Sequence, residues 1–330
     1  MSSASVPETE LRIEPDAVVH RAAASQPSRN DTMARMLRFR TLLCLALAGT
    51  AAAQPTLSEL LENKTMAELQ RFDETFDGAL GVAAIDLTTG RMFGMHSGTV
   101  FPQASVIKIA ILARMYQAAR AGKFALDDRV TIQLREAVGG SGRLQERLKS
   151  GAPVTLTVRE LIDAMIEWSD NTATNKCIAL ASMDDVNRML DELGLPHTRL
   201  RRKMMDSAAV ARGEENVSTP EEMARLVETI YRGKLVDQAA SREMLEILKK
   251  VEGGIHEGLP LDIETASKTG ELPGARGETG IVFLEGRPFA LSVMSAYIDD
   301  RRSPVPEVTR IVYRYFEKLA GANAWGNRLR

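Results

Sequence analysis

The sequence predicts a mixed α/β (α+β) fold, in which one antiparallel sheet is built from both chain ends and a helical domain is inserted between them. β-like runs occur at 79–86 and 91–95, and strand patterns return only after about residue 260. The stretch between, from about 100 to 250, is mostly helical in pattern. Strands at both ends of a chain are most economically joined in one sheet, with a cleft between the two lobes.

The first 53 residues are typical of a leader rather than of a folded domain. Residues 36–53 combine two basic residues, Arg38 and Arg40, with a short apolar run and a string of small residues. This pattern predicts a signal peptide over about 33–53 and export to the bacterial periplasm or beyond. An uncleaved anchor is the alternative, although the apolar run is short for a bilayer. Residues 1–32 are interpreted as an upstream extension.

Composition excludes several classes of function. A net charge of −2 with 26% charged residues gives no electrostatic case for nucleic-acid binding. One of the two cysteines, Cys44, lies in the leader, so Cys177 has no partner for an internal disulfide. The histidines that follow the leader, His96, His197 and His256, lack metal-ligand spacing, so we expect no metal and no cofactor.

The α/β lobe is expected over 54–103 and 251–325. Its expected elements are a helix over 56–76, a hairpin turning at Thr88-Thr89-Gly90, three strands after residue 260, and a helix from about Val305 to Ala320. The chain is long enough after the leader to supply a sizeable core. A monomer is expected, with membrane contact only through the export signal.

The all-α lobe expected over 104–250 opens with an apolar run, 105–121, that lacks Gly and Pro and is typical of a buried helix. Capping boxes are predicted where Thr157 precedes Glu160 and where Thr219 precedes Glu222. Residues 200–218 have no clean period and are predicted as a long loop. Loops of this length in compact domains are usually functional.

The first polar residues of the apolar run are Ser105 and Lys108. Positions three apart lie on one face of a helix, so a weak nucleophile stands beside an amine that could act as its base. Taken alone, the pair is more typical of a helix cap and of a lysine that extends its ammonium to solvent.

Two further motifs decide between these interpretations. S-D-N occupies 169–171 in a turn between helices, and K-T-G occupies 268–270 at the end of a strand. Each alone is typical of capping residues or of a protected sheet edge. Together with S-x-x-K, in this order and at spacings of 64 and 99 residues, they form the motif set of class A β-lactamases and penicillin-binding proteins. From about Gly81 to Ile298 the chain resembles that family, which implies a β-lactamase-like fold.

The resemblance implies a catalytic role for four residues. Ser105 would be the acylated nucleophile and Lys108 would take its proton. Ser169 would relay the proton to the departing lactam nitrogen, and Lys268 would supply positive potential.

The resemblance also implies how a small β-lactam or acyl-D-amino substrate is held. Asn171 would contact the side-chain amide of the substrate and Lys108. Thr269, with Lys268, would hold the substrate carboxylate, and Gly270 would let the backbone approach a ligand. The backbone N–H groups of Ser105 and Glu271 would form the oxyanion hole.

One departure from the family concerns deacylation. Hydrolytic class A relatives carry a glutamate about 36 residues after S-D-N, and here that place falls on Met204, which cannot deprotonate water. Asp206, Glu214 and Glu215 are the nearest carboxylates, so one of them could substitute, or deacylation is slow.

Other departures are milder. Arg202 matches the arginine that holds this loop in the family, and its usual aspartate partner is replaced by Asn216, with Glu215 as a substitute. Thr279 stands where many relatives have an arginine, and Arg276 is the candidate replacement.

We therefore predict an exported serine β-lactamase-like hydrolase. The alternatives are a D,D-peptidase-like amidase or esterase and a slowly deacylating penicillin-binding protein.

Overall fold

The computed structural model describes residues 54–299 and 302–329, so the predicted leader lies outside the described residues. The described residues from Pro55 onward form one compact unit. Within the described ranges, no helix combines the length and the apolar character needed to cross a bilayer.

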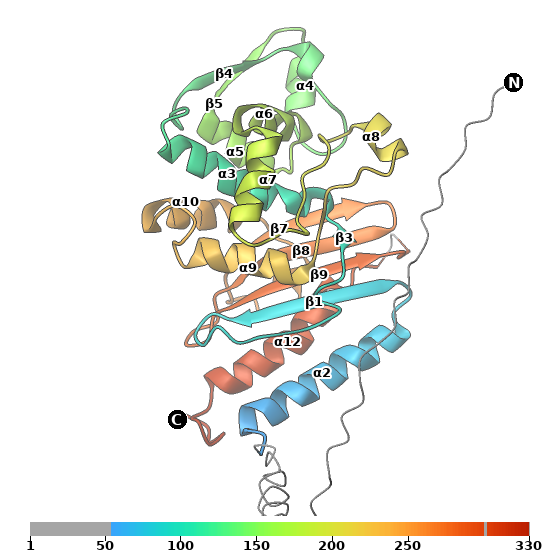
Figure 1. Cartoon of the computed structure of the whole chain (residues 1–330), viewed down its shortest axis with the longest axis vertical. Helices are drawn as coiled ribbons and strands as arrows, with labels where there is room; N and C mark the ends of the chain where they lie inside the picture. The colour runs from blue at the N-terminus through green and yellow to red at the C-terminus, as the bar shows by residue number, and fades with distance from the viewer. Residues whose placement is uncertain (1–53, 300–301, 330) are drawn as a thin grey trace, which may run out of the picture. The chain divides into compact units, whose positions relative to one another are not determined.

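A five-stranded antiparallel sheet forms the base of this unit, in the order β2-β1-β9-β8-β7 (Figure 1). The strands are β1 (Ala79–Asp86), β2 (Met92–Met95), β7 (Thr265–Leu272), β8 (Ala275–Val282) and β9 (Phe289–Ala296). Because β1 pairs with β9, the two ends of the chain meet in one sheet, which confirms the predicted fold class.

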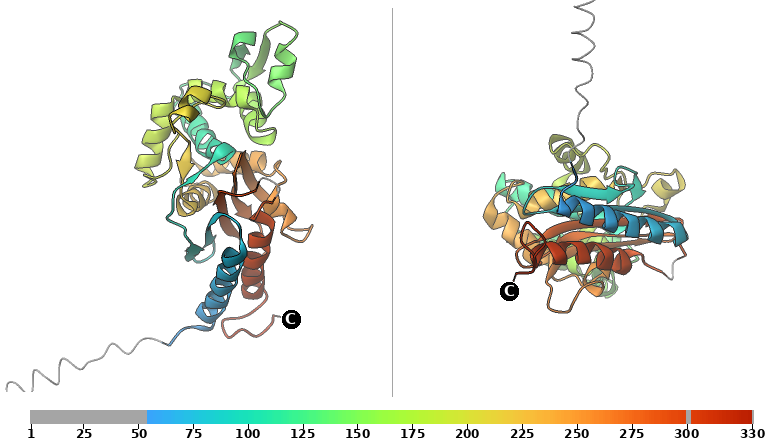
Figure 2. Two further views of the ribbon diagram at one scale, coloured as in Figure 1. Left: turned by 90° about the vertical axis from the view of Figure 1, so that its right-hand side faces the viewer. Right: turned by 90° about the horizontal axis from the view of Figure 1, so that it is seen from below.

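Helices cover both faces of the sheet. α2 (Leu57–Thr75) and α12 (Val305–Ala320) lie side by side on one face, as Figures 1 and 2 show, and α9 (Pro220–Tyr231) packs on the other. On the α12 face, the ring of Phe316 stacks on that of Phe289 with centroids 4.2 Å apart. β1, β8 and β9 are buried along most of their length because both faces of the sheet are covered, and the apolar residues of β1 and β9 form nearly continuous runs instead of alternating with polar ones.

The inserted lobe packs its helices around α3 (Lys108–Arg120), whose residues from Lys108 to Ala113 are all buried. Its other main helices are α5 (Val158–Glu167), α6 (Asn171–Ala181), α7 (Met183–Glu192) and α10 (Gln238–Leu248). The prediction of an all-α lobe needs correction, because β4 (Arg129–Ile132) pairs with β5 (Val154–Thr157). Both segments are short and rich in β-branched residues, which favour strands.

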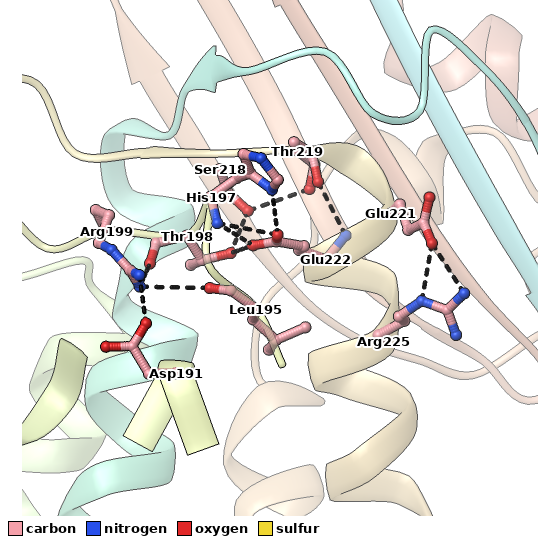
Figure 3. Close-up of polar contacts among 10 residues, drawn as sticks. All are labelled: Asp191, Leu195, His197, Thr198, Arg199, Ser218, Thr219, Glu221, Glu222 and Arg225. Atoms are coloured by element: carbon pink, nitrogen blue, oxygen red, sulfur yellow. Dashed lines mark hydrogen bonds and ion pairs between the residues drawn. The ribbon is translucent and has the colours of Figure 1, made fainter. Parts of the chain in front are cut away.

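Only one of the two hydrogen bonds of the predicted capping box at the start of α9 is present. Thr219 caps the helix by accepting from the backbone N–H of Glu222 at 3.2 Å. The Glu222 carboxylate, however, does not reach back to Thr219: it accepts from the backbone N–H of His197 at 3.0 Å and from Thr198 Oγ1 at 2.6 Å (Figure 3). It thereby ties α9 to the segment that leads into the loop over 200–218.

Candidate active site

Ser105 lies in a 3-10 turn rather than in the first turn of a regular helix. The turn, η1 (Ala104–Ile107), precedes α3, and Ala104 before the nucleophile has a φ of +49°. A non-glycine residue in this region is strained, and such strain persists where surrounding contacts hold it. Ser105 is partly exposed and lines a cavity of about 440 Å³, the volume of a small-ligand site.

Lys108 is completely buried at the first turn of α3. Its Nζ donates to the carbonyl oxygen of Ser169 at 2.8 Å, to Ser169 Oγ at 3.0 Å and to Asn171 Oδ1 at 3.2 Å. Three acceptors therefore fix the amine between S-x-x-K and S-D-N. No hydrogen bond joins Lys108 to Ser105 among the described residues, so the amine is positioned through the S-D-N turn.

The environment of Lys108 favours the neutral amine. Burial lowers its pKa well below the usual lysine value, and the positive charge of Lys268 lowers it further. Asp170 acts in the opposite direction, more weakly. An amine that is neutral near pH 7 can accept a proton from a hydroxyl, which a surface lysine cannot.

The S-D-N turn is rigid because Asp170 holds it from two sides. Asp170 Oδ1 caps α6 by accepting from the N–H of Ala173 at 2.8 Å. Its Oδ2 accepts from the N–H groups of Arg143 and Leu144 at 2.7 and 2.8 Å. Ser169, with a φ of +52°, is thereby held in the left-handed region with its oxygens toward Lys108.

Lys268 extends along the edge strand β7 and is 1% exposed. Its Nζ donates to the carbonyl oxygen of Thr269 at 3.1 Å and lies 3.4 Å from Thr269 Oγ1. Burial lowers the pKa of Lys268 to about 8, against the attraction of Glu278. The second lysine is thus charged at pH 7 while the first is pushed towards neutrality.

Gly270 permits a close approach of another part of the chain. A Cβ at this position would lie 2.6 Å from the carbonyl oxygen of Gln103 and 3.0 Å from the N of Val106. The neighbour is therefore the chain's own nucleophile turn. Glycine here lets β7 pack directly against η1, which brings K-T-G beside Ser105.

Met204 occupies the wall of the cavity that Ser105 also lines. Asn175 of α6 fixes its backbone, with Oδ1 accepting from the Met204 N–H at 2.8 Å and Nδ2 donating to its carbonyl at 3.1 Å. Met205, Val210 and Leu272 line the same cavity, which gives this part of the wall an apolar character.

The three carboxylates considered for deacylation are engaged elsewhere and do not line this cavity. Asp206 caps the short helix α8 (Ser207–Ala211). Glu214 pairs with Arg212 at 2.8 Å, at the surface. Glu215 pairs with the buried Arg202 at 2.8 Å.

The ends of the 200–218 loop are joined by Arg202 and Asn216, as the motif comparison led us to expect. Asn216 Oδ1 accepts from the N–H groups of Arg201 and Arg202 at 2.8 and 3.0 Å, and its Nδ2 donates to the Arg202 carbonyl at 3.2 Å. Asn216 therefore supports the loop backbone, and Glu215 supplies the charge partner.

The two residues of the other departure from the family, Arg276 and Thr279, are engaged within the protein. Arg276 pairs with the side chain of Glu271 at 2.7 Å. Thr279 is fully buried and lies 2.8 Å from Ser292 Oγ, away from solvent. Within the described residues, no group of three or more His, Cys, Asp or Glu side chains could hold a metal ion.

Sequence reasoning missed two residues near this site. Asn175 holds Met204, and Glu278 lies buried on β8 opposite Thr269. Asn175 carried a weak signal, since it is a polar residue on the buried helix that follows S-D-N. Glu278 carried none, because a glutamate between Gly277 and Thr279 is typical of an exposed strand end.

Comparison with known proteins gives consistent results. A family model described as "Beta-lactamase enzyme family" matches residues 64–316. The β-lactamase of Bacillus licheniformis is 27% identical over 292 residues, covering 82% of this chain and 91% of that protein.

Solved structures are similar as well. An ancestral class A β-lactamase (GNCA) is 28% identical with a TM-score of 0.70, covering 76% of this chain and all of that one. A PBP-A mutant, described as an acyl-enzyme complex with penicillin G, is 26% identical with a TM-score of 0.70, covering 80% of this chain and all of that one. The chain therefore belongs to the β-lactamase enzyme family, and it is a serine hydrolase of the class A type.

Proposed function

We propose that this protein is acylated at Ser105 by β-lactams, with cleavage of the lactam C–N bond, and that it then hydrolyses the acyl-enzyme. The observation that carries the proposal is the buried Lys108. Its amine is held by Ser169 and Asn171 beside the cavity that Ser105 lines. A buried amine with a lowered pKa has a clear use as a base and little use as a structural element.

In the proposed acylation, Lys108 takes the proton of Ser105 as Oγ bonds to the lactam carbonyl carbon. The C–N bond breaks when the nitrogen receives a proton through Ser169, which lies 3.0 Å from Lys108 Nζ. The proton thus passes from Ser105 to the leaving nitrogen, and Lys108 and Ser169 return to their starting protonation states.

The substrate is recognised in this proposal by its charge and by its carbonyl groups. Lys268 and Thr269 bind the carboxylate of the substrate at the edge of β7. The N–H groups of Ser105 and Glu271, both of which line the cavity, stabilise the oxyanion. Asn171 orients the side-chain amide of the substrate.

Deacylation is proposed to be slow. Met204 and Met205 stand in the cavity wall, and Asp206, Glu214 and Glu215 have partners elsewhere. A missing general base typically costs about 10²–10⁴ in rate. This observation favours, as a second candidate, a D,D-peptidase-like or penicillin-binding protein that keeps the acyl group for a long time.

The cellular setting also belongs to the proposal. The basic start, apolar run and small residues of 33–53 support export, and class A relatives are typically exported. We infer a periplasmic or secreted monomer.

Stopped-flow absorbance with a chromogenic cephalosporin tests both steps. We expect a burst of about one product per enzyme, followed by a slow linear phase. The absence of both a burst and turnover would contradict acylation at Ser105. Fast linear turnover without a burst would contradict slow deacylation and indicate a working second base.

A further inference from the structure

Glu278 is a buried carboxylate that the proposed chemistry does not use. It is 1% exposed on β8, paired across the strands with Thr269, while its neighbour Thr279 is paired with Lys268. Successive residues of a strand point to opposite faces, so the Glu278 side chain lies on the α12 face of the sheet and that of Lys268 starts from the other. The carboxylate is therefore hidden behind the proposed carboxylate-binding edge.

Three elements enclose this carboxylate. Its Oε1 accepts from Ser267 Oγ at 2.6 Å, and its Oε2 accepts from the N–H of Ile255 in α11 (Gly254–Glu257) at 3.1 Å. A Cβ at Gly253 would lie 2.6 Å from both carboxylate oxygens and 2.5 Å from Thr269 Cγ2. The backbone at Gly253 therefore fits between the carboxylate and the methyl group of Thr269.

These contacts connect Glu278 to both residues of the binding edge. The packing of Thr269 Cγ2 against Gly253 restricts its rotamer, which in turn directs Oγ1 towards Lys268 Nζ, 3.4 Å away. Lys268 donates only to Thr269 among the described residues. Its amine thus has no carboxylate in direct contact before substrate arrives, and Glu278 is the negative group that acts on it from behind.

The electrostatic balance at Lys268 depends on few groups. Burial lowers its pKa to about 8, and Glu278 opposes this. The ionisable groups of the elements packed on β7 are Arg276 (paired with Glu271) and Glu278 on β8, Arg242, Glu243 and Glu246 on α10, His256 and Glu257 on α11, and Lys108, which directly follows η1. Of these, Glu243 pairs with Arg159 and Glu246 with Lys249.

We propose that Glu278 is a positioning residue for substrate binding: its buried carboxylate, held by Ser267 and by the N–H of Ile255, supports the K-T-G edge from behind, and its contacts hold Thr269 at the edge of β7. Burial raises the pKa of Glu278, whereas these hydrogen bonds favour its ionised form, and the ionised carboxylate opposes the lowering of the Lys268 pKa. The inference rests on the proposed function, in which that edge receives the carboxylate of a β-lactam. A carboxylate in a dry site acts more strongly on a neighbouring amine than one at the surface, because water does not screen it.

The test is the pH profile of acylation of the full chain by benzylpenicillin, with Glu278→Gln compared with the native protein. Loss of the carboxylate lowers the pKa of Lys268, so the alkaline limb moves to lower pH. A shift of about one pH unit predicts a loss of about fivefold at pH 8 and little loss at pH 6. Penicillin methyl ester, which lacks the carboxylate, is expected to acylate both proteins with the same pH dependence.

Two matched variants separate charge from packing. Ser267→Ala removes the 2.6 Å hydrogen bond but leaves the carboxylate, so the limb should stay near its native position. The double variant Ser267→Asp with Glu278→Gln returns a carboxylate to the same enclosed space, and it should restore the limb. If Glu278→Gln does not fold, Glu278→Asp, which moves the charge back by one methylene, is expected to shift the limb in the same direction by less.

An unshifted limb in folded Glu278→Gln or Glu278→Asp would overturn the inference. So would equal losses with benzylpenicillin and with its methyl ester, because these indicate a purely structural role. Absence of acylation in the native protein would instead refute the proposed function.

Discussion

Replacing Met204 with glutamate should shorten the lifetime of the acyl-enzyme. Met204 is 7% exposed and shares its cavity with Ser105, and Asn175 holds its backbone at both the N–H and the carbonyl. A carboxylate at this position would therefore enter the cavity from a fixed point. General-base assistance is typically worth about 10²–10⁴, so deacylation of Met204→Glu should accelerate by about that range.

The control is Met204→Gln, which has nearly the same shape but cannot take a proton. Both variants lose the burial of a methionine side chain, worth about 1.5–3 kcal/mol, so both should unfold at a lower temperature than the native protein. The ratio of their deacylation rates isolates the base from the loss of packing. The assay is pulse labelling with benzylpenicillin, removal of free drug, and intact-mass spectrometry of the remaining adduct over time. If the two variants lose the penicillin adduct at the same rate, position 204 in the cavity wall is not the site of the missing base.

Further predictions follow from the same geometry. Acylation by benzylpenicillin should show a bell-shaped pH profile of kcat/KM, because the rate falls on the acid side as Lys108 gains a proton and on the alkaline side, near pH 8, as Lys268 loses one. Lys108→Ala should slow acylation by about 10²–10⁴ in a single-turnover assay, and a loss below tenfold would contradict its role as base. Asn216→Ala should lower the free energy of unfolding by about 1–3 kcal/mol in urea titration, because it leaves buried backbone groups of Arg201 and Arg202 without their partner; no change would show that water replaces the amide.

The sheet and the terminal helices could be predicted because their residues carry clear local signals. The apolar runs of 79–86 and 289–296 match β1 and β9, and Val305 begins α12 as expected. The short strands β4 and β5 could not be distinguished from irregular segments, because each has four residues and gains its stability only by pairing with the other.

The main residues of the site were predicted from motif spacing, but their contacts were not. Sequence spacing suggested that Lys108 faces Ser105, whereas its Nζ donates hydrogen bonds to Ser169 and Asn171 across the lobe. The role of Gly270 depends on the distance between β7 and η1, which no local pattern encodes. Long-range contacts of this kind arise from packing, so they emerge only when the chain is folded.

The loop over 200–218 shows the same limit. Arg202 was expected to have a partner, and Glu215 proved to be its charge partner while Asn216 took the backbone groups. The carboxylates near Met204 looked equivalent in the sequence. Their partners differ in the folded chain, because Asp206 caps α8, Glu214 pairs with Arg212 and Glu215 pairs with Arg202.

The central claim is that Ser105 forms a long-lived acyl-enzyme. Its most direct test is intact-mass spectrometry of the protein with benzylpenicillin, followed by peptide mapping, on the native protein and on Ser105→Ala. We predict one added penicillin on the peptide that contains Ser105, persisting long after free drug is removed, and no addition to Ser105→Ala. An adduct that survives in Ser105→Ala, or none in the native protein, would contradict the account.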